Sequence, residues 1–413
     1  MGPDDIQPKD SPDALLGDLA SILPFVNCDF SNPSEIDRFE SEGIPAGMDN
    51  DQAWTALEWV RKLSCGVPVC GKVRDCGMPQ TWIALTPDLT AALFRVEHRG
   101  RGKGALLSEV TSYVSSNGYY PPRLSDIRIA LESDGIQIDY EDLAALARGR
   151  TPEGPDEQVA ARALWLLSRT DPGLDAPLLA SEVLDAQISL DEASGGIFPV
   201  IEPVYKPKYF CPLTGPELFE EFASRPEDSQ TPALILVLLA SSHCFHQRPF
   251  PRWNDILSLF VTKRLFESIG APLLQYLPLR GPYLACGSSL KSFGTIEGPH
   301  GRDHTPAFSM MLRTLENGLK DLSARLAKWR ENQRKFAEAI ERDACLTLRQ
   351  KSLLKSLSES PMMAIPAAEY AERCDIATST AYTDLHKLVT LGYLTMNGDN
   401  GRMTFSLRRA EDR

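Results

Sequence analysis

The stretch ATSTAYTDLHKLVTLGYLTMNGDNGRMTFSL, residues 377–407, decides the fold of the C-terminal part of the chain. Its first half has the spacing of a helix, with Thr378 or Ser379 as the expected N-cap and Gly392 directly after its end. The run Asn-Gly-Asp-Asn-Gly at 397–401 is a strong hairpin-turn signal between two short strands. The stretch therefore predicts a helix followed by a two-stranded β-hairpin.

Two further helices are predicted just before this stretch. LTLRQKSLLKSLSE (346–359) places three leucines on one face, and IPAAEYAERCDI (365–376) has helical spacing as well. Three helices followed by a two-stranded wing make a winged helix-turn-helix. The sequence predicts this fold over roughly 346–407, within a C-terminal domain at 343–413.

The third predicted helix would enter the major groove of DNA with its N-terminal residues. The candidate DNA contacts are Thr378, Ser379, Thr380, Tyr382, Thr383 and Lys387 on this helix, and Arg402 in the wing. The helix carries no arginine, which is the commonest specific reader of guanine. The chain also has a formal net charge of −13, which is unlike that of proteins that coat nucleic acid. The helix could instead pack on its own protein or on a protein partner, so DNA and a partner both stay open.

The bulk composition excludes several classes of protein. The 413 residues are 43% hydrophobic and 24% charged, which suits two or three globular domains. No apolar run reaches the ~20 residues that cross a bilayer, and the acidic start MGPDDIQPKDSPD is unlike a secretory signal. We therefore expect a cytoplasmic protein without membrane contact. Cys65, Cys70 and Cys76 are separated by four and five residues and do not form the two close pairs of a structural zinc site, so no metal site is predicted.

The remainder of the chain predicts a mainly α fold. Residues 1–100 are read as a mixed N-terminal region, partly disordered, then with a helix near 50–63 and a small hairpin within 64–98. Residues 101–342 are read as a helical core. Its expected elements are helices across 105–171, loops with one or two short strands across 172–230, a buried helical pair at 231–269, and one or two long amphipathic helices at 303–342.

The segment between the two buried helices reads QRPFPRWNDILSL, residues 247–259. It resembles the Fic signature HPFxDGNGRxxR, with Pro249, Phe250 and Asn254 at matching places. The wider order is similar to a Fic subgroup that ends in a winged helix, since DHTPAF (303–308) and Leu-Arg-Gln (348–350) stand where that subgroup has further motifs. The resemblance covers roughly residues 105–407 and implies an α-helical Fic-like core.

In the Fic family, the motif transfers AMP from ATP to a protein hydroxyl. Its histidine is the general base, its acidic residue holds Mg²⁺ on the phosphates, its glycines admit backbone N–H groups to the anion, and its arginines bind phosphate. This chain has other residues at those places: Arg248 for the base, Arg252 for the acid, Trp253 and Asp255 for the glycines, and Ile256 and Leu259 for the arginines. Standard AMP transfer and Mg²⁺ binding are therefore not expected, while a nucleotide stays an open candidate ligand.

Two alternatives concern the polar residues of this segment. His243 and His246 could supply a substitute base, or could lie on the last turn of the preceding helix, where a cation suits the helix dipole. Arg248 and Arg252 could form a new anion site, or could be salt-bridged.

Three functions follow from these alternatives. The first is a catalytically degenerate regulatory or interaction protein acting through its winged helix. The second is a transferase with altered chemistry, and the third is a ligand-sensing transcriptional regulator. Pairing of two copies as a homodimer is a further expectation left open.

Overall fold

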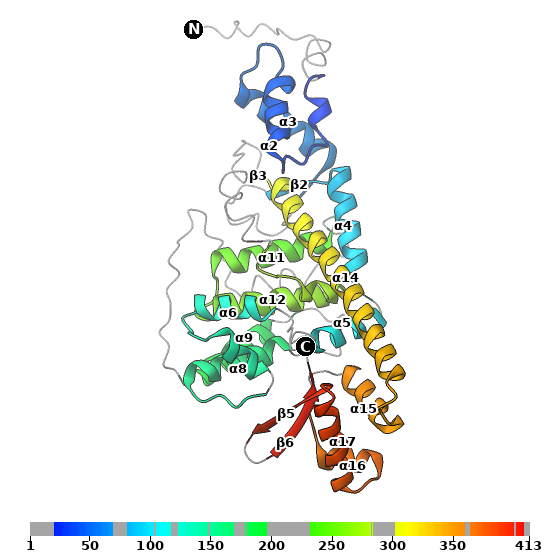
Figure 1. Cartoon of the computed structure of the whole chain (residues 1–413). Helices are drawn as coiled ribbons and strands as arrows, with labels where there is room; N and C mark the ends of the chain where they lie inside the picture. The colour runs from blue at the N-terminus through cyan, green and yellow to red at the C-terminus, as the bar shows by residue number, and fades with distance from the viewer. Residues whose placement is uncertain are drawn as a thin grey trace, which may run out of the picture.

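The structure is a computed structural model. It describes residues 20–68, 81–102, 105–116, 123–147, 149–168, 178, 180–195, 232–281, 283, 302–359, 364–399 and 402–408. The described part is mainly helical, as the sequence predicts (Figure 1). Its buried apolar residues form three clusters: one in the N-terminal segment, a large central one, and one at the C-terminus.

The N-terminal cluster is built on aromatic rings. Its elements are η1 (Leu23–Phe25), α2 (Pro33–Arg38), η2 (Phe39–Gly43) and α3 (Asn50–Cys65). Phe39 packs against Phe25, Phe30 and Trp54, with ring centroids 4.5 to 6.1 Å apart. Asp49 begins α3 with a capping box shared with Gln52.

A small sheet connects this segment to a distant part of the chain. Strand β1 (Gly66–Pro68) pairs antiparallel with β2 (Thr81–Ala84), which is the hairpin predicted within 64–98. Strand β3 (Arg302–Asp303) then adds parallel to β2. The buried Arg61 of α3 ion-pairs with Asp303 at 3.0 Å and donates to the carbonyl of Val26 at 3.0 Å. These contacts fix the N-terminal cluster to the start of the longest helix.

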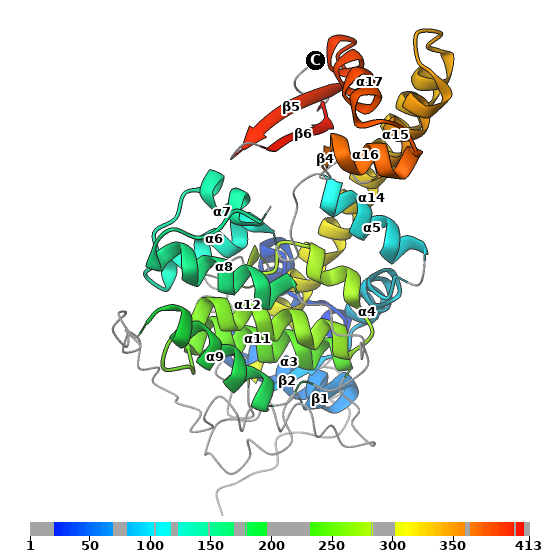
Figure 2. The same ribbon diagram turned by 90° about the horizontal axis from the view of Figure 1, so that it is seen from below.

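The central cluster surrounds a buried helix, α12. Its helices are α4 (Pro87–Gly100), α5 (Ala105–Ser116), α6 (Leu124–Ser133), α7 (Tyr140–Ala147), α8 (Pro155–Ser168), α9 (Ala180–Ala193), α11 (Ala233–Gln247), α12 (Asn254–Ser268) and η4 (Pro272–Tyr276). Every residue of α12 from Asn254 to Glu267 is buried. In Figure 2, α6, α7 and α8 lie to one side of α12, and α4 lies to the other.

Two expectations for this region were wrong in part. Helix α4 occupies much of the stretch read as a hairpin, because Leu89, Leu93 and Val96 recur at helical spacing and are buried. Helix α9 lies in the stretch read as loops and short strands, because Val183, Ala186 and Leu190 make an apolar stripe three and four residues apart. The segment GGIFPVIEPVY, read as a strand, lies almost entirely outside the described residues.

One long helix, α14 (Thr305–Arg342), forms where the sequence predicts one or two. Its 38 residues span about 57 Å at 1.5 Å per residue. Buried leucines recur along it every three to four residues: Leu312, Leu315, Leu319, Leu322 and Leu326. Its last turns pack into the C-terminal cluster through Ile340. Figure 1 shows α14 running beside α4 and ending next to α15.

The described residues after α14 are called the C-terminal unit below, and their buried apolar side chains form the C-terminal cluster together with Ile340 of α14. Its elements are α15 (Leu348–Glu359), β4 (Ala364–Pro366), α16 (Ala367–Cys374), α17 (Thr378–Thr390), β5 (Leu394–Asp399) and β6 (Arg402–Leu407). The strands form one antiparallel sheet in the order β4-β6-β5, with Met396 opposite Phe405. Strand β4 was not expected. Ala377, and not Thr378 or Ser379, is the N-cap of α17, and it makes no side-chain capping bond.

Of the helices that the structure describes, none is both long enough and apolar enough to cross a membrane. The proposed domain boundaries at 100 and 342 stay a prediction.

Candidate functional site

The loop between α11 and α12, residues 248–253, is held in a strained shape. Arg248 ends α11 with φ 49°, and Trp253 begins α12 with φ 57°, so both lie in the left-handed region. Such a conformation costs a residue other than glycine about 1–3 kcal/mol unless its surroundings enforce it. Trp253 therefore keeps the backbone geometry that glycine would adopt without strain.

Asn254 supplies the bonds that close this loop. Its side-chain oxygen accepts from the Phe250 N–H at 2.9 Å, and its amide nitrogen donates to the Phe250 carbonyl at 2.7 Å. Phe250 is itself buried in the central cluster, while Pro249 is half-buried. The three residues at matching motif places thus fix the loop backbone.

The N-terminus of α12 is covered by a carboxylate from another helix. Asp134 directly follows α6, and its side chain is 5% exposed. Its Oδ2 accepts from the backbone N–H of Asp255 at 3.1 Å and of Ile256 at 3.0 Å. A helix N-terminus attracts anions through unpaired N–H groups and its dipole. Here the protein's own carboxylate takes that position.

Two arginines accompany this carboxylate. Arg248 lies 3.3 Å from Asp134 and 3.2 Å from Asp255, and Arg280 lies 3.3 Å from Asp255. Ser133 donates its hydroxyl to Asp255 at 2.6 Å. Two acidic and two basic side chains therefore meet at one end of α12.

Asp134 has an unusual protonation equilibrium. Burial, together with repulsion from Asp255, raises the pKa of Asp134 to about 7, although the two helix N–H groups and Arg248 oppose the rise. The site thus holds a carboxyl group that titrates near neutral pH.

The other side of the loop is filled by an indole. Trp253 is 3% exposed, and its Nε1–H donates to Asp191 of α9 at 2.9 Å. Arg252 reaches the same Asp191 oxygen at 3.4 Å. Both loop arginines thus lie in ion pairs, which favours the salt-bridged interpretation over an open anion site.

The remaining residues singled out by the motif add no charge to the loop. Ile256 and Leu259, at the arginine places of the motif, are fully buried in the apolar cluster. His243 and His246 lie on α11, but their side chains fall outside the described residues. Cys70 and Cys76 also fall outside, and the described ranges contain no cluster of acidic, histidine and cysteine side chains able to hold a metal.

Sequence reasoning missed Asp134 and Asp191. They lie 121 and 62 residues before their partners Asp255 and Trp253. Neither belongs to a motif, and only the packing of α6 and α9 against α12 brings them to the loop. A single sequence offers no signal that would have found them.

A second candidate surface lies on α17 of the C-terminal unit. The helix residues predicted to contact DNA are all exposed: Thr378, Ser379, Thr380, Tyr382, Thr383 and Lys387. Lys387 donates to the Cys345 carbonyl at 2.6 Å, so its ammonium is held toward the α14–α15 connection. Exposed His386, stacked on Tyr382, was missed and lies on the same face. Arg402 lies in β6, but its side chain is outside the described residues.

The buried side of α17 is anchored by one carboxylate. Asp384 accepts from Arg349 at 2.5 Å and from Gln350 at 2.9 Å, both on α15, and Tyr370 of α16 lies 3.4 Å away. Burial and the charge of Asp384 raise the pKa of Tyr370 to about 12. Residues 349 and 350, part of the Leu-Arg-Gln match, thus hold α15 to α17.

Known proteins include a distant structural likeness to this chain. No family model matches the chain, and no curated protein matches it. Among solved structures, the chain is similar to a Fic family protein from Desulfovibrio desulfuricans G20. The two are 12% identical, the match covers 78% of this chain and 97% of that one, and the TM-score is 0.36. A likeness of this degree carries no argument about the site.

Proposed function

We propose that this protein is a regulatory or interaction protein with a Fic-like helical core that does not transfer nucleotides. The observation that supports this most directly is the Asp134 carboxylate on the N-terminus of α12. An incoming phosphate would have to displace a buried, hydrogen-bonded side chain of its own sign. It would also meet the carboxylate of Asp255 nearby.

The chemistry of the loop points the same way. Arginine at position 248 cannot act as a general base, because a guanidinium carries only N–H donors and has no acceptor for the proton. Arg252 stands where the resemblance implies a Mg²⁺ ligand, and a cation repels the metal. The buried indole of Trp253 fills space at a place where the motif has glycine. At the compared motif positions, none of the residues that would act as base, bind Mg²⁺ or hold phosphate is of the type that AMP transfer needs.

Label transfer tests this proposal. The full-length protein is incubated with Mg²⁺ and radiolabelled ATP, GTP, UTP or CTP, alone and with a cell extract, beside an Arg248→Ala variant. We expect no labelled protein above the level of a heat-treated control. Labelling that is present in the wild type and lost in Arg248→Ala would refute the proposal and support the altered-transferase alternative.

We infer that the C-terminal unit is a winged helix-turn-helix that makes the protein's regulatory contact. The order of three helices and a β-hairpin supports this, and so does the exposed hydroxyl-rich face of α17. Residues 343–413 contain nine acidic and nine basic residues, so this part is neutral on a chain of net charge −13. The unit therefore does not add to the repulsion between the protein and a polyanion.

DNA binding is the contact tested first. A gel shift with the protein's own promoter region is run across a salt series, because phosphate contacts weaken with salt. Thr380→Asp places a charge on the predicted face, and Thr390→Asp places the same charge at the far end of α17. We expect Thr380→Asp alone to abolish the shift. The absence of a shift at low salt would exclude DNA as the contact of the C-terminal unit, and a protein partner would remain.

A further inference from the structure

A cavity separate from the loop lies between α4, α5, η4 and α14. Its volume is about 830 Å³, it is open to solvent on one side, and it shares no lining residue with the loop at 248–255. Small-molecule sites usually have roughly 300–1,000 Å³. The cavity therefore has room for a small molecule.

The floor of the cavity is aliphatic. Six apolar side chains line it: Leu106, Val110, Leu273, Leu319, Leu322 and Leu326. Among the described residues that line it there is no Phe, Tyr or Trp, which are the side chains that stack on bases and other flat rings. An alkyl chain suits this floor better than a nucleotide or an aromatic ring does.

Gly102, just after α4, is packed tightly against this floor. It has φ +31°, and a Cβ atom there would lie 2.3 Å from Cγ of Leu273. Glycine thus allows the backbone at this position to contact Leu273 closely. The floor is a built part of the fold.

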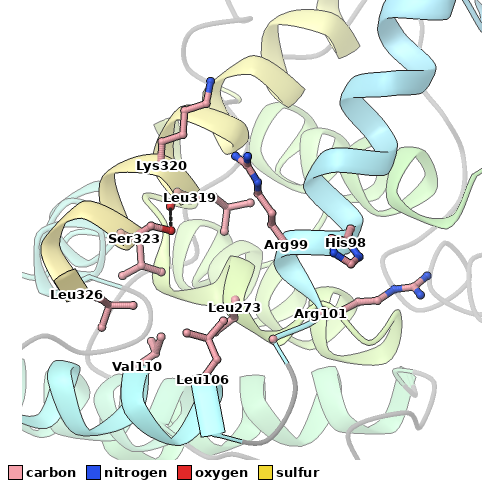
Figure 3. Close-up of a pocket in the computed structure, with 12 residues that line it drawn as sticks. His98, Arg99, Arg101, Leu106, Val110, Leu273, Leu319, Lys320, Ser323 and Leu326 are labelled. Carbon is pink, nitrogen blue, oxygen red and sulfur yellow. Dashed lines mark hydrogen bonds between the residues drawn. The ribbon is translucent and has the colours of Figure 1, made fainter. Parts of the chain in front are cut away.

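The rim of the cavity is cationic. Arg99, Arg101, His98 and Lys320 line it, and none of the twelve lining residues is acidic, although the chain carries 56 acidic residues against 43 lysines and arginines. Figure 3 shows Arg99 and Lys320 extending toward each other beside Leu319, while Arg101 points away. Within the described ranges, Arg99 makes no ion pair.

Glu316, which lies beside Lys320, does not neutralise this rim. Lys320 lies 3.4 Å from Glu316, but Arg95 already binds both oxygens of that carboxylate, at 3.1 and 3.3 Å. A surplus of positive charge therefore stands at one end of the aliphatic floor.

We propose that this cavity binds a single-chain amphiphile with an anionic head group. The carboxylate or phosphate head lies between Arg99 and Lys320, and the alkyl chain covers the leucines of α5 and α14. The site does not depend on the state of the loop at 248–253 or on the function proposed above.

Calorimetric titration of the full-length protein tests this site. The probes are octanoate, decanoate and dodecanoate below their micelle concentrations, with decyl phosphate and decyltrimethylammonium as head-group controls. We expect saturable binding that strengthens roughly fourfold for each added methylene. The comparison of decanoate with decyl phosphate decides which head group is preferred. Equal binding of the cationic amphiphile, no dependence on chain length, or no saturable binding overturns the proposal.

Three variants locate the ligand. Arg99→Ala and Lys320→Ala should each weaken decanoate binding about three- to tenfold. Lys328 is also exposed and lies on α14 with Lys320, but it does not line the cavity, so Lys328→Ala should leave decanoate binding unchanged. Leu106 is 38% exposed, so Leu106→Trp should fold and block the cavity. An equal effect of Lys328→Ala, or undiminished binding to Leu106→Trp, places the ligand elsewhere and refutes the site.

Discussion

Replacement of Asp134 by asparagine should flatten the pH dependence of stability. The pKa of Asp134 rises from 3.8 in the unfolded chain to about 7 in the folded protein, because of burial and the nearby Asp255. A raised carboxyl pKa means that the folded state holds a proton that the unfolded state has lost. The resulting stability is fully present below pH 3.8 and is lost as the pH rises through 7.

The size of the effect follows from the shift. Each pKa unit corresponds to about 1.36 kcal/mol, so the rise of about 3 units corresponds to about 4 kcal/mol in total. Between pH 5 and pH 8, about 2–3 kcal/mol of this stability is lost. Asparagine has no charge to lose, yet its oxygen can still accept from the N–H groups of Asp255 and Ile256.

Urea unfolding followed by circular dichroism at pH 5 and pH 8 measures this. From pH 5 to pH 8, the free energy of unfolding of the wild type should fall by about 2–3 kcal/mol more than that of Asp134→Asn. Asp191→Asn removes a partly exposed carboxylate on α9 and serves as the control, with a pH dependence like that of the wild type. If Asp134→Asn retains the full pH dependence, the carboxyl at the N-terminus of α12 does not titrate as argued.

Three further substitutions test the packing around the site, each by chemical denaturation. Trp253→Gly should lower the free energy of unfolding by about 2–4 kcal/mol, because the lost packing outweighs the relief of a positive φ. Trp253→Phe should lower it by about 1 kcal/mol, because the hydrogen bond to Asp191 is lost. A Trp253→Gly variant as stable as wild type would contradict a filled loop. Asn254→Ala should lower the free energy of unfolding by about 2–4 kcal/mol, because the N–H and C=O of Phe250 lose their partner. Asn50→Ala removes an exposed hydrogen bond and should change it by less than about 0.5 kcal/mol. Equal losses in the two variants would disprove the role of Asn254. Arg61→Ala should cost about 3–5 kcal/mol by leaving Asp303 buried and unpaired, against less than about 1 kcal/mol for Arg95→Ala on an exposed pair. Similar values for the two arginines would mean that the buried pair does not anchor the N-terminal cluster.

The mainly helical class could be predicted because the helices carry clear apolar stripes. Leu312 to Leu326 in α14 show this, and so does the apolar helix α11. Where the prediction was wrong, as for α9, proline and glycine in the neighbouring residues obscured a short stripe. The N-cap of α17 was misplaced by one or two residues, because Ala377 caps the helix without a side-chain bond.

The loop at 248–253 could be located from the sequence, but its state could not. The motif comparison singled out Arg248, Arg252 and Trp253 and left open whether the arginines face a ligand. The answer depends on Asp134 and Asp191, which belong to α6 and α9 in their packed positions. Long-range pairs of this kind carry no local pattern, so a single sequence does not reveal them.

The central claim is that the N-terminus of α12 is filled by the protein itself and does not accept a nucleotide. Calorimetric titration at pH 8, where Asp134 is mostly ionised, tests it most directly, with Mg²⁺ and ATP, GTP, UTP or CTP as ligands. We expect no saturable heat for any of the four nucleotides with the wild-type protein. Saturable binding that weakens in Arg248→Ala would contradict it, because it would show that a phosphate reaches the position that Asp134 occupies.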